Sequence, residues 1–200
     1  MSVIEFFAVL TSVIYVILAA KQKLSCWYFA MASVLLYLYI CFEAHLFAET
    51  GLQIFYIGTT IYGWYHWKYG NQEAEDAVPV IDWGVKEHLF TLSAGAVLVY
   101  LIGSYLETHT SAFLPYVDSF TSVFGVIATV MGTRKILSNW LYWTVIDGIS
   151  VYMYAIKGLE LTSGLFVFYT IMTIYGFISW RKEYLKSKAE SAEKISVGLS

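Results

Sequence analysis

The sequence predicts an all-α membrane protein with seven transmembrane helices, built from two three-helix bundles that are joined by one further helix. Its composition is the first reason: 58% of the 200 residues are hydrophobic and only 14% are charged, which an ordinary soluble domain does not show. The second reason is that the apolar residues gather into seven stretches. The third is that the second half of the chain repeats the first half in a constant register.

The seven apolar stretches are separated by the loops and turns that hold most of the charged residues. In chain order they cover residues 3 to 20, 26 to 42, 51 to 67, 89 to 106, 117 to 133, 139 to 156 and 163 to 180. Several are close to the minimum of about 17 residues that a helix needs to cross a bilayer. The first stretch lacks a basic start and a small-residue cleavage site, so we expect it to remain as a span.

The repeat is clearest between Leu24 and Trp67, where 14 of 44 positions are identical to their partners when Leu24 is aligned with Leu137. Among the matches, Phe55-Tyr56 and Thr60-Ile61-Tyr62-Gly63 recur as Phe168-Tyr169 and Thr173-Ile174-Tyr175-Gly176. The repeat has no gap. This pattern indicates a duplication, because chance similarity between apolar segments would not keep one register over this length.

Each repeat contains three spans, so a second copy joined directly to the first would enter the membrane upside down. The stretch at residues 89 to 106 corrects this as an inversion linker, which predicts a parallel 3+1+3 arrangement. Parallel repeats form a substrate site at their interface in several transporter folds. The expected domains are a first bundle (1–68), a loop with the linker helix (69–116), a second bundle (117–183) and a disordered polar tail (184–200).

The basic residues predict the orientation. With the N-terminus outside, eleven of the twelve lysines and arginines fall in cytoplasmic segments, and only Lys157 lies outside. This distribution follows the positive-inside rule. We therefore expect a multi-pass protein whose C-terminus is cytoplasmic.

One polar stripe in the sixth stretch occurs in only one repeat. Asn139, Trp143 and Asp147 follow one another at intervals of four residues and share one helix face, which Ser150 and Tyr154 extend. A carboxylate at mid-span costs at least about 2.5–3.5 kcal/mol. No lysine or arginine lies at matching depth, so its natural counter-charge is a ligand. With Trp140 and tyrosines nearby, the stripe would suit a flat aromatic cation.

A second stripe on the third stretch completes the predicted substrate-binding set, which comprises Asn139, Trp140, Trp143, Asp147, Gln53, Tyr56, Thr60 and Trp64. Three alternatives stay open at this point. Tryptophans such as Trp64 also serve as anchors at the membrane interface. Asp147 could instead be protonated and hydrogen-bonded, or belong to a proton path. Asp118, after Pro115, could cap the fifth helix or form an outer gate.

The sequence lacks the motifs that are typical of several other functional classes. Cys26 and Cys41 have no metal or disulfide spacing, and packing explains them. The chain has no ATP-binding loop, no enzyme motif, no metal set and no nucleic-acid patch, so we expect neither an enzyme nor a cofactor. A membrane receptor remains possible, and it would bind a ligand without moving it.

Three motifs carry a family resemblance that covers residues 1 to 183. They are Pro115-x-x-Asp118-Ser119, then Thr133-Arg134-Lys135 before Asn139-Trp140-x-x-Trp143-x-x-x-Asp147, and Leu52-Gln53 with Ile61-Tyr62-Gly63-Trp64-Tyr65-x-Trp67. In these motifs the chain resembles the PnuC family of bacterial vitamin transporters. The resemblance implies a SWEET-like fold in the inner membrane, a homotrimer, and facilitated diffusion of an unphosphorylated vitamin that a cytoplasmic kinase then traps.

The resemblance leaves nicotinamide riboside, thiamine and riboflavin as substrates. This chain departs from the pattern of nicotinamide riboside carriers, which have Asn where it has Asp147, Thr60 and Tyr175, and Glu where it has Ser138. A carboxylate could bind the aminopyrimidine of thiamine by hydrogen bonds. We therefore expect a thiamine-transporting branch, with nicotinamide riboside as the alternative and riboflavin less favoured.

Overall fold

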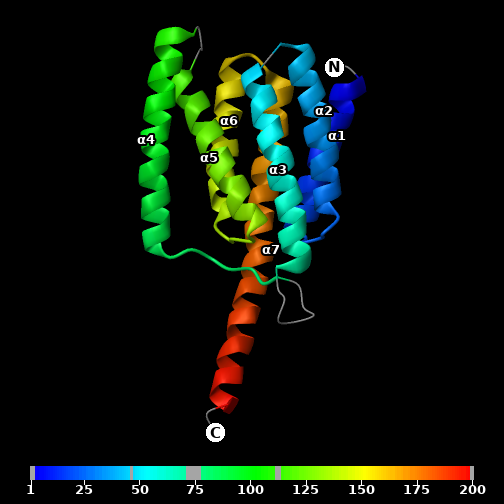
Figure 1. The fold of residues 1–200 in the computed structure, drawn as a ribbon, viewed down its shortest axis with the longest axis vertical. Helices are drawn as coiled ribbons and strands as arrows, with labels where there is room; N and C mark the ends of the chain where they lie inside the picture. The colour runs from blue at the N-terminus through cyan, green and yellow to red at the C-terminus, as the bar shows by residue number, and fades with distance from the viewer. Residues whose placement is uncertain (1–2, 46, 71–77, 111–113, 199–200) are drawn as a thin grey trace. The chain divides into compact units, whose positions relative to one another are not determined.

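The computed structural model of the protein is all-α and describes residues 3–45, 47–70, 78–110 and 114–198. Within these residues it has seven helices (Figure 1). They are α1 (Val3–Ala20), α2 (Cys26–Glu43), α3 (Phe47–Tyr69), α4 (Val85–His109), α5 (Pro115–Thr133), α6 (Asn139–Ile156) and α7 (Glu160–Gly198). The number and order of the helices match the prediction.

Four of the seven helices are long and apolar enough to cross a membrane by length and composition. They are α1, α2, α4 and the part of α7 from Glu160 to Glu190. The other three carry the polar side chains that were singled out above, including Gln53 on α3 and Asp147 on α6. Polar residues lower the apolar character of a span that is shielded from lipid, so α3, α5 and α6 remain expected spans rather than observed ones.

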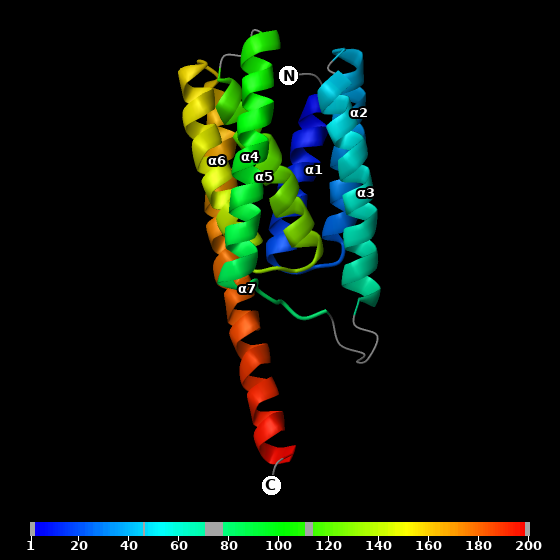
Figure 2. The ribbon, with the colours of Figure 1, turned by 60° about the vertical axis from the view of Figure 1, so that its left-hand side comes forward.

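The chain forms two compact units. The first contains residues 1–80, 133–135 and 178–200, and the second contains residues 81–132 and 136–177. In the first unit, α1 packs on α2 and α2 packs on α3 (Figure 2). The buried ring of Trp27 on α2 lies where Gly63 of α3 leaves room for it. The second unit has a core of Phe124, Ala128 and Ile146 from α5 and α6.

The register of the repeat recurs in the local geometry of the helices. α2 begins at Cys26 and α6 at the equivalent Asn139, and both helices have 18 residues. Positive backbone φ angles occur at the equivalent positions Gln22 (54°) and Lys135 (54°), and again at His45 (57°) and Gly158 (72°). Trp27 packs on Gly63, and Trp140 packs on Gly176 in the same way. The duplication seen in the sequence is therefore also a duplication of backbone conformation and of helix contacts.

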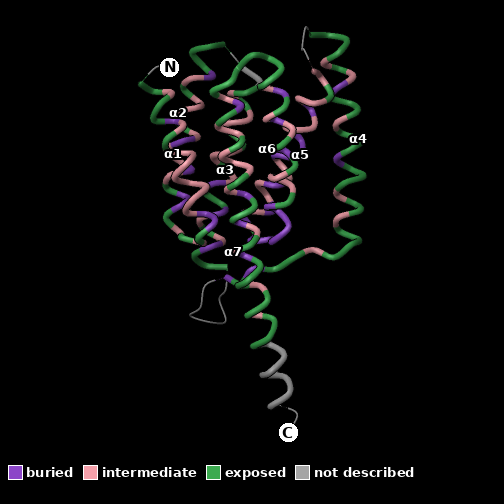
Figure 3. The backbone as a smooth tube through the Cα atoms, turned by 180° about the vertical axis from the view of Figure 1, so that it is seen from behind, coloured by how far each residue is buried: buried purple, intermediate pink, exposed green. Residues whose placement is uncertain are grey.

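Helix α4 is exposed along most of its length (Figure 3), and its only buried residues are Gly95 and Gly103. Phe90 and Tyr100 are 76% and 65% exposed. Its 25 residues span about 37 Å at about 1.5 Å per residue, which exceeds the hydrocarbon core of a bilayer. Such an exposed apolar surface requires lipid or another protein to cover it.

The C-terminal tail differs from the expectation of disorder from residue 184. Helix α7 continues to Gly198. Lys186 and Glu190 form an ion pair one turn apart, at 3.9 Å, and lysine, glutamate and alanine all favour the helix. The polar composition that suggested disorder is therefore also compatible with a solvated helix.

Alanine at Gly63 should lower the free energy of unfolding, because its methyl group would meet the buried Trp27 ring. Overpacked sites of this kind cost about 1–3 kcal/mol. Gly58 on the same helix is the matched control: open space surrounds its Cβ position, so Gly58→Ala should raise stability by up to about 1 kcal/mol. Thermal unfolding in detergent measures both changes, and equal midpoints for the two variants would contradict the packing account.

Candidate substrate-binding site

The stripe on α6 is largely buried in the second unit. Asn139, Asp147 and Ser150 are 3%, 4% and 3% exposed, and Trp143 is half-buried. Their spacing of three or four residues keeps them on one side of the helix. The polar residues that the sequence placed on one helix face therefore lie largely on the buried face of α6.

Two members of the stripe bind the backbone of their own helix region. The Asn139 amide donates to the Ile136 carbonyl at 2.6 Å, and the Ser150 hydroxyl donates to the Ile146 carbonyl at 2.9 Å. The start of α6 is held further by the Ser138 backbone N–H, which donates to Asp82 at 3.1 Å. Asn139 therefore also acts in fixing the turn before α6, a role that its spacing did not reveal.

Asp147 differs from its neighbours on the stripe. Among the described residues, no hydrogen bond or ion pair reaches its carboxylate, although the residue is only 4% exposed. A buried carboxylate without a partner is strongly disfavoured, because neither water nor protein compensates for the lost hydration. Among the described residues, the Asp147 carboxylate therefore lacks the hydrogen-bond donor or cation that it needs.

Aromatic side chains surround this region of the second unit. Trp143 packs against the core of Phe124, Ala128 and Ile146. Trp140 is 5% exposed, and its ring packs against Gly176 of α7, so helix packing is a role it shares with its equivalent, Trp27. The half-buried Trp143 is the better placed of the two tryptophans for contact with a ligand.

A polar contact joins α6 and α7 at Thr173, as expected for a threonine that both repeats share. Thr144 donates a hydrogen bond to Thr173 at 3.0 Å, and Thr173 donates to the Thr170 carbonyl at 2.9 Å. Thr173 is 4% exposed. The identity of Thr60 and Thr173 across the repeat was the available signal, since it marked both positions as shared helix contacts.

The stripe on α3 lies in the first unit. Gln53, Tyr56 and Trp64 are half-buried, and Thr60 is 5% exposed. The Trp64 indole donates to the Tyr28 hydroxyl at 3.3 Å, and the Lys68 ammonium lies 4.7 Å from its ring centroid. These contacts agree with an anchoring role for Trp64. Gln53, Tyr56 and Thr60 keep the helical spacing that made them candidates.

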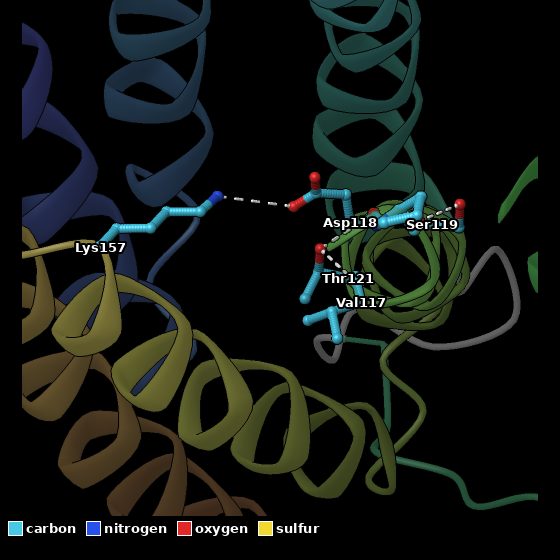
Figure 4. Close-up of polar contacts among 6 residues, drawn as sticks. Val117, Asp118, Ser119, Thr121 and Lys157 are labelled. Carbon is cyan, nitrogen blue, oxygen red and sulfur yellow. Dashed lines mark hydrogen bonds and ion pairs between the residues drawn. The ribbon is translucent and has the colours of Figure 1, made fainter. Parts of the chain in front are cut away.

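Asp118 lies in the first turn of α5 and forms an ion pair with Lys157, which follows α6 (Figure 4). The carboxylate oxygen and the ammonium nitrogen are 4.0 Å apart, and the side chains are 35% and 27% exposed. No hydrogen bond from this carboxylate to the backbone of α5 occurs among the described residues, and its ion pair links two helix ends. The cap or outer gate expected at Asp118 stays a prediction. Lys157 was conspicuous in the sequence as the one basic residue outside the cytoplasmic segments.

These features define a class of protein: a membrane protein whose apolar helices hold a buried polar stripe, as in proteins that move a small solute. The chain belongs to the family described as nicotinamide mononucleotide transporter, whose profile matches residues 2–182. It is therefore a multi-pass membrane transporter and not an enzyme. The predicted membership of the PnuC family is confirmed.

Individual relatives show how close the similarity is. The nicotinamide riboside transporter PnuC of Escherichia coli strain K12 is 27% identical over 205 residues, which cover 90% of this chain and 85% of that protein. PnuC of Neisseria mucosa is 25% identical over 88% of this chain and 70% of its own length. The riboflavin/roseoflavin transporter RibM of Streptomyces davaonensis is 24% identical over 78% of this chain and 73% of its own. None of these three is named for thiamine.

A solved structure shows the same fold. The crystal structure of the vitamin B3 transporter PnuC superposes with a TM-score of 0.71 over 90% of this chain and 81% of that one, at 24% sequence identity. The all-α prediction is thereby confirmed at the level of the fold.

Asparagine at Asp147 should stabilise the protein without ligand, because it replaces a buried carboxylate that has no partner by a neutral group of similar shape. We expect a gain of about 1–3 kcal/mol, the range for an unsatisfied buried polar group. Asp118→Asn is the matched control. It removes a partly exposed ion pair and should lower stability by less than about 1 kcal/mol. Thermal unfolding in detergent tests both variants, and a loss of stability in Asp147→Asn would show that its carboxylate is satisfied.

Proposed function

We propose that this protein takes up an unphosphorylated vitamin by facilitated diffusion, and that nicotinamide riboside is its first candidate substrate. The observation that carries the proposal is the buried carboxylate of Asp147, which has no partner among the described residues. A cationic substrate would supply the missing counter-charge, and the half-buried Trp143 one turn earlier would stack on a flat ring. Nicotinamide riboside combines both features in its pyridinium ring.

The sign of the charge favours a nucleoside over a nucleotide. Asp147 is the one ionisable residue in the α6 stripe of Asn139, Trp143, Asp147 and Ser150. The phosphate of a mononucleotide would add negative charge close to that carboxylate, and like charges at short range in a poorly hydrated site repel strongly. The unphosphorylated vitamin avoids this repulsion, and a cytoplasmic kinase would then trap it inside.

Our sequence-based preference for thiamine is the second candidate. The names of the relatives favour nicotinamide riboside. Thiamine keeps one specific argument, which is that Asp147 stands where the nicotinamide riboside carriers of the family resemblance have asparagine. Its thiazolium is cationic and its aminopyrimidine can donate hydrogen bonds to a carboxylate. Riboflavin is neutral and leaves the charge of Asp147 unbalanced.

The architecture that we propose is the parallel 3+1+3 arrangement of a SWEET-like fold, with residues 1–68 and 117–183 as the two bundles. The common register of helix starts, positive φ angles and Trp–Gly contacts supports it. The exposed apolar length of α4 is compatible with a linker that faces lipid or a neighbouring copy in a homotrimer. The N-terminus would lie outside the inner membrane and the C-terminus in the cytoplasm.

The residues of each stripe are candidate substrate contacts within their own unit. Asp147 supplies the charge, Trp143 and Trp140 the aromatic surface, and Asn139 a polar edge. In the first unit, the candidate substrate contacts on α3 are Gln53, Tyr56, Thr60 and Trp64, which offer hydrogen-bonding groups and aromatic rings. Rocking of one bundle against the other would then expose the substrate alternately to each side.

Purified protein should bind nicotinamide riboside with quenching of tryptophan fluorescence, and Asp147→Asn should weaken binding at least tenfold, which corresponds to about 1.4 kcal/mol. Glu160→Gln is the control, since its carboxylate is exposed at the start of α7. Parallel titrations with thiamine and with nicotinamide mononucleotide define the substrate. Tight binding of thiamine alone would restore the thiamine branch, and equal affinity of Asp147→Asn and wild type would remove Asp147 from the site.

Flux separates a transporter from a receptor. In proteoliposomes loaded with buffer alone, labelled nicotinamide riboside should equilibrate across the membrane with no added energy source. Binding without equilibration would point to a receptor. Uptake that requires a proton gradient would contradict facilitated diffusion and return Asp147 to the role of a proton site.

A further inference from the structure

The turn between α5 and α6 contains a buried lysine. Lys135 is 3% exposed and has a φ angle of 54°, a left-handed backbone conformation that non-glycine residues adopt rarely. Burial lowers the pKa of Lys135, and the Cys26 thiol and the Glu183 carboxylate offset this only in part. A lysine kept in such an unfavourable place is held by specific contacts.

Those contacts all lie in the first unit. The Lys135 ammonium donates to the Val78 carbonyl at 2.8 Å and to the Gln22 side-chain oxygen at 3.2 Å. It also lies 4.8 Å from the ring centroid of Trp67. Trp67 in turn packs against Trp180, with 5.7 Å between ring centroids, and the Trp180 indole donates to the Ala19 carbonyl at 3.1 Å.

The partners in this cluster are equivalent positions of the repeat. In the register that aligns Leu24 with Leu137, Gln22 corresponds to Lys135 and Trp67 to Trp180. Two equivalent residues of a duplicated chain are separated by twice their distance from the axis that relates the copies. They can touch only close to that axis. Two pairs that touch therefore mark the place where the repeats meet at the end of the molecule that carries the turns after α1 and α5.

We propose that Gln22, Trp67, Lys135 and Trp180 form the cytoplasmic gate of the transporter, which is closed in this structure and must come apart to release the substrate. The proposal rests on the proposed function, because it assigns this end to the cytoplasm and assumes alternating access. The two tryptophan rings pack against each other next to Lys135. The lysine joins the turn after α5 to the turn after α1 and to Val78, which follows α3.

The chemistry of the cluster suits a contact that forms and breaks. Lys135 has no carboxylate partner among the described residues and is held by two neutral oxygens and a ring. When the gate opens, water replaces these acceptors and restores the hydration of the ammonium. The closed and open states are then close in energy, because the desolvation of the ammonium opposes the contacts that it gains.

A native cysteine can report the opening. Cys26 is the first residue of α2 and is fully buried, and it lies close enough to Lys135 for their charges to influence one another. Replacing Cys41, the second of two cysteines, by serine leaves Cys26 as the single thiol. A membrane-impermeant maleimide added to inside-out vesicles then measures access from the cytoplasmic side.

Lys135→Met should raise the rate of Cys26 labelling at least tenfold, because it removes both hydrogen bonds and the cation from the closed gate. Arg134→Met is the control: it removes a positive charge from the neighbouring, exposed residue and should leave the rate unchanged. Gln22→Ala removes one of the two hydrogen bonds and should raise the rate by a smaller factor. The Gln22→Ala variant is used for the test if Lys135→Met does not yield a monodisperse protein.

Unchanged labelling in the folded Lys135→Met and Gln22→Ala variants would overturn the gate, and so would equal acceleration by Arg134→Met. Because labelling needs no substrate, these outcomes are independent of the flux assay. Faster labelling together with an absence of vitamin flux in the wild type would contradict the proposed function and leave the moving contact in place. Vitamin flux in the wild type together with unchanged labelling in the variants would support the proposed function and contradict the gate.

Discussion

The membrane demands that each buried polar group find a partner within the protein, and the rest of the structure depends on that constraint. In lipid no water can replace a missing hydrogen bond, so spans are helical and their polar side chains bind nearby groups. The Trp180 indole donates to a backbone carbonyl, and Thr144 donates to Thr173. Neutral groups such as the Trp27 indole N–H are also buried with no partner among the residues that the structure describes, but a carboxylate costs far more to leave unpaired. Asp147 is the buried carboxylate without a partner among the described residues. We propose that a bound ligand supplies its missing counter-charge.

The features that the sequence could predict are those that depend on local pattern. Apolar stretches and the register of the repeat located α6 at Asn139–Ile156 and α2 to within one residue. The helical stripe through Asp147 was placed on the buried face because a spacing of four residues determines the side of a helix. Contacts between distant segments are beyond such reasoning. The pairing of Asp118 with Lys157 and the bonds from Lys135 to Val78 and Gln22 depend on how the helices pack. Sequence pattern could not locate the end of α7, because polar composition describes a disordered tail and a solvated helix equally well.

The choice of substrate shows a different limit. A carboxylate beside a tryptophan attracts a pyridinium and a thiazolium alike, since the Coulomb and cation–π terms depend on charge and distance and hardly on ring identity. Discrimination comes from the uncharged half of the vitamin, whose partners in the proposed site include Gln53, Tyr56 and Thr60. Relatives at 24–27% identity include carriers of two different vitamins, so the family determines the class of solute, and a few side chains determine which member of the class is taken.

In the repeat arrangement that we propose, the two most unusual charges each occur in only one repeat. Asp147 is matched by Val34 in the other repeat and Lys135 by Gln22, so each repeat supplies the backbone position and only one supplies the charge. Both charges are buried, and neither has an ionic partner in the part of the chain that the structure describes. For Lys135, each hydrogen bond to a charged group contributes about 1.5–3 kcal/mol and the cation–π contact up to about 2 kcal/mol, while desolvation of the ammonium costs several kcal/mol. These terms nearly cancel. In the facilitated diffusion that we propose, no energy source forces the gate open, so contacts whose formation and rupture are nearly balanced suit the transport cycle. The same reasoning applies to Asp147, whose unmet charge favours the loaded carrier only as long as the substrate is bound.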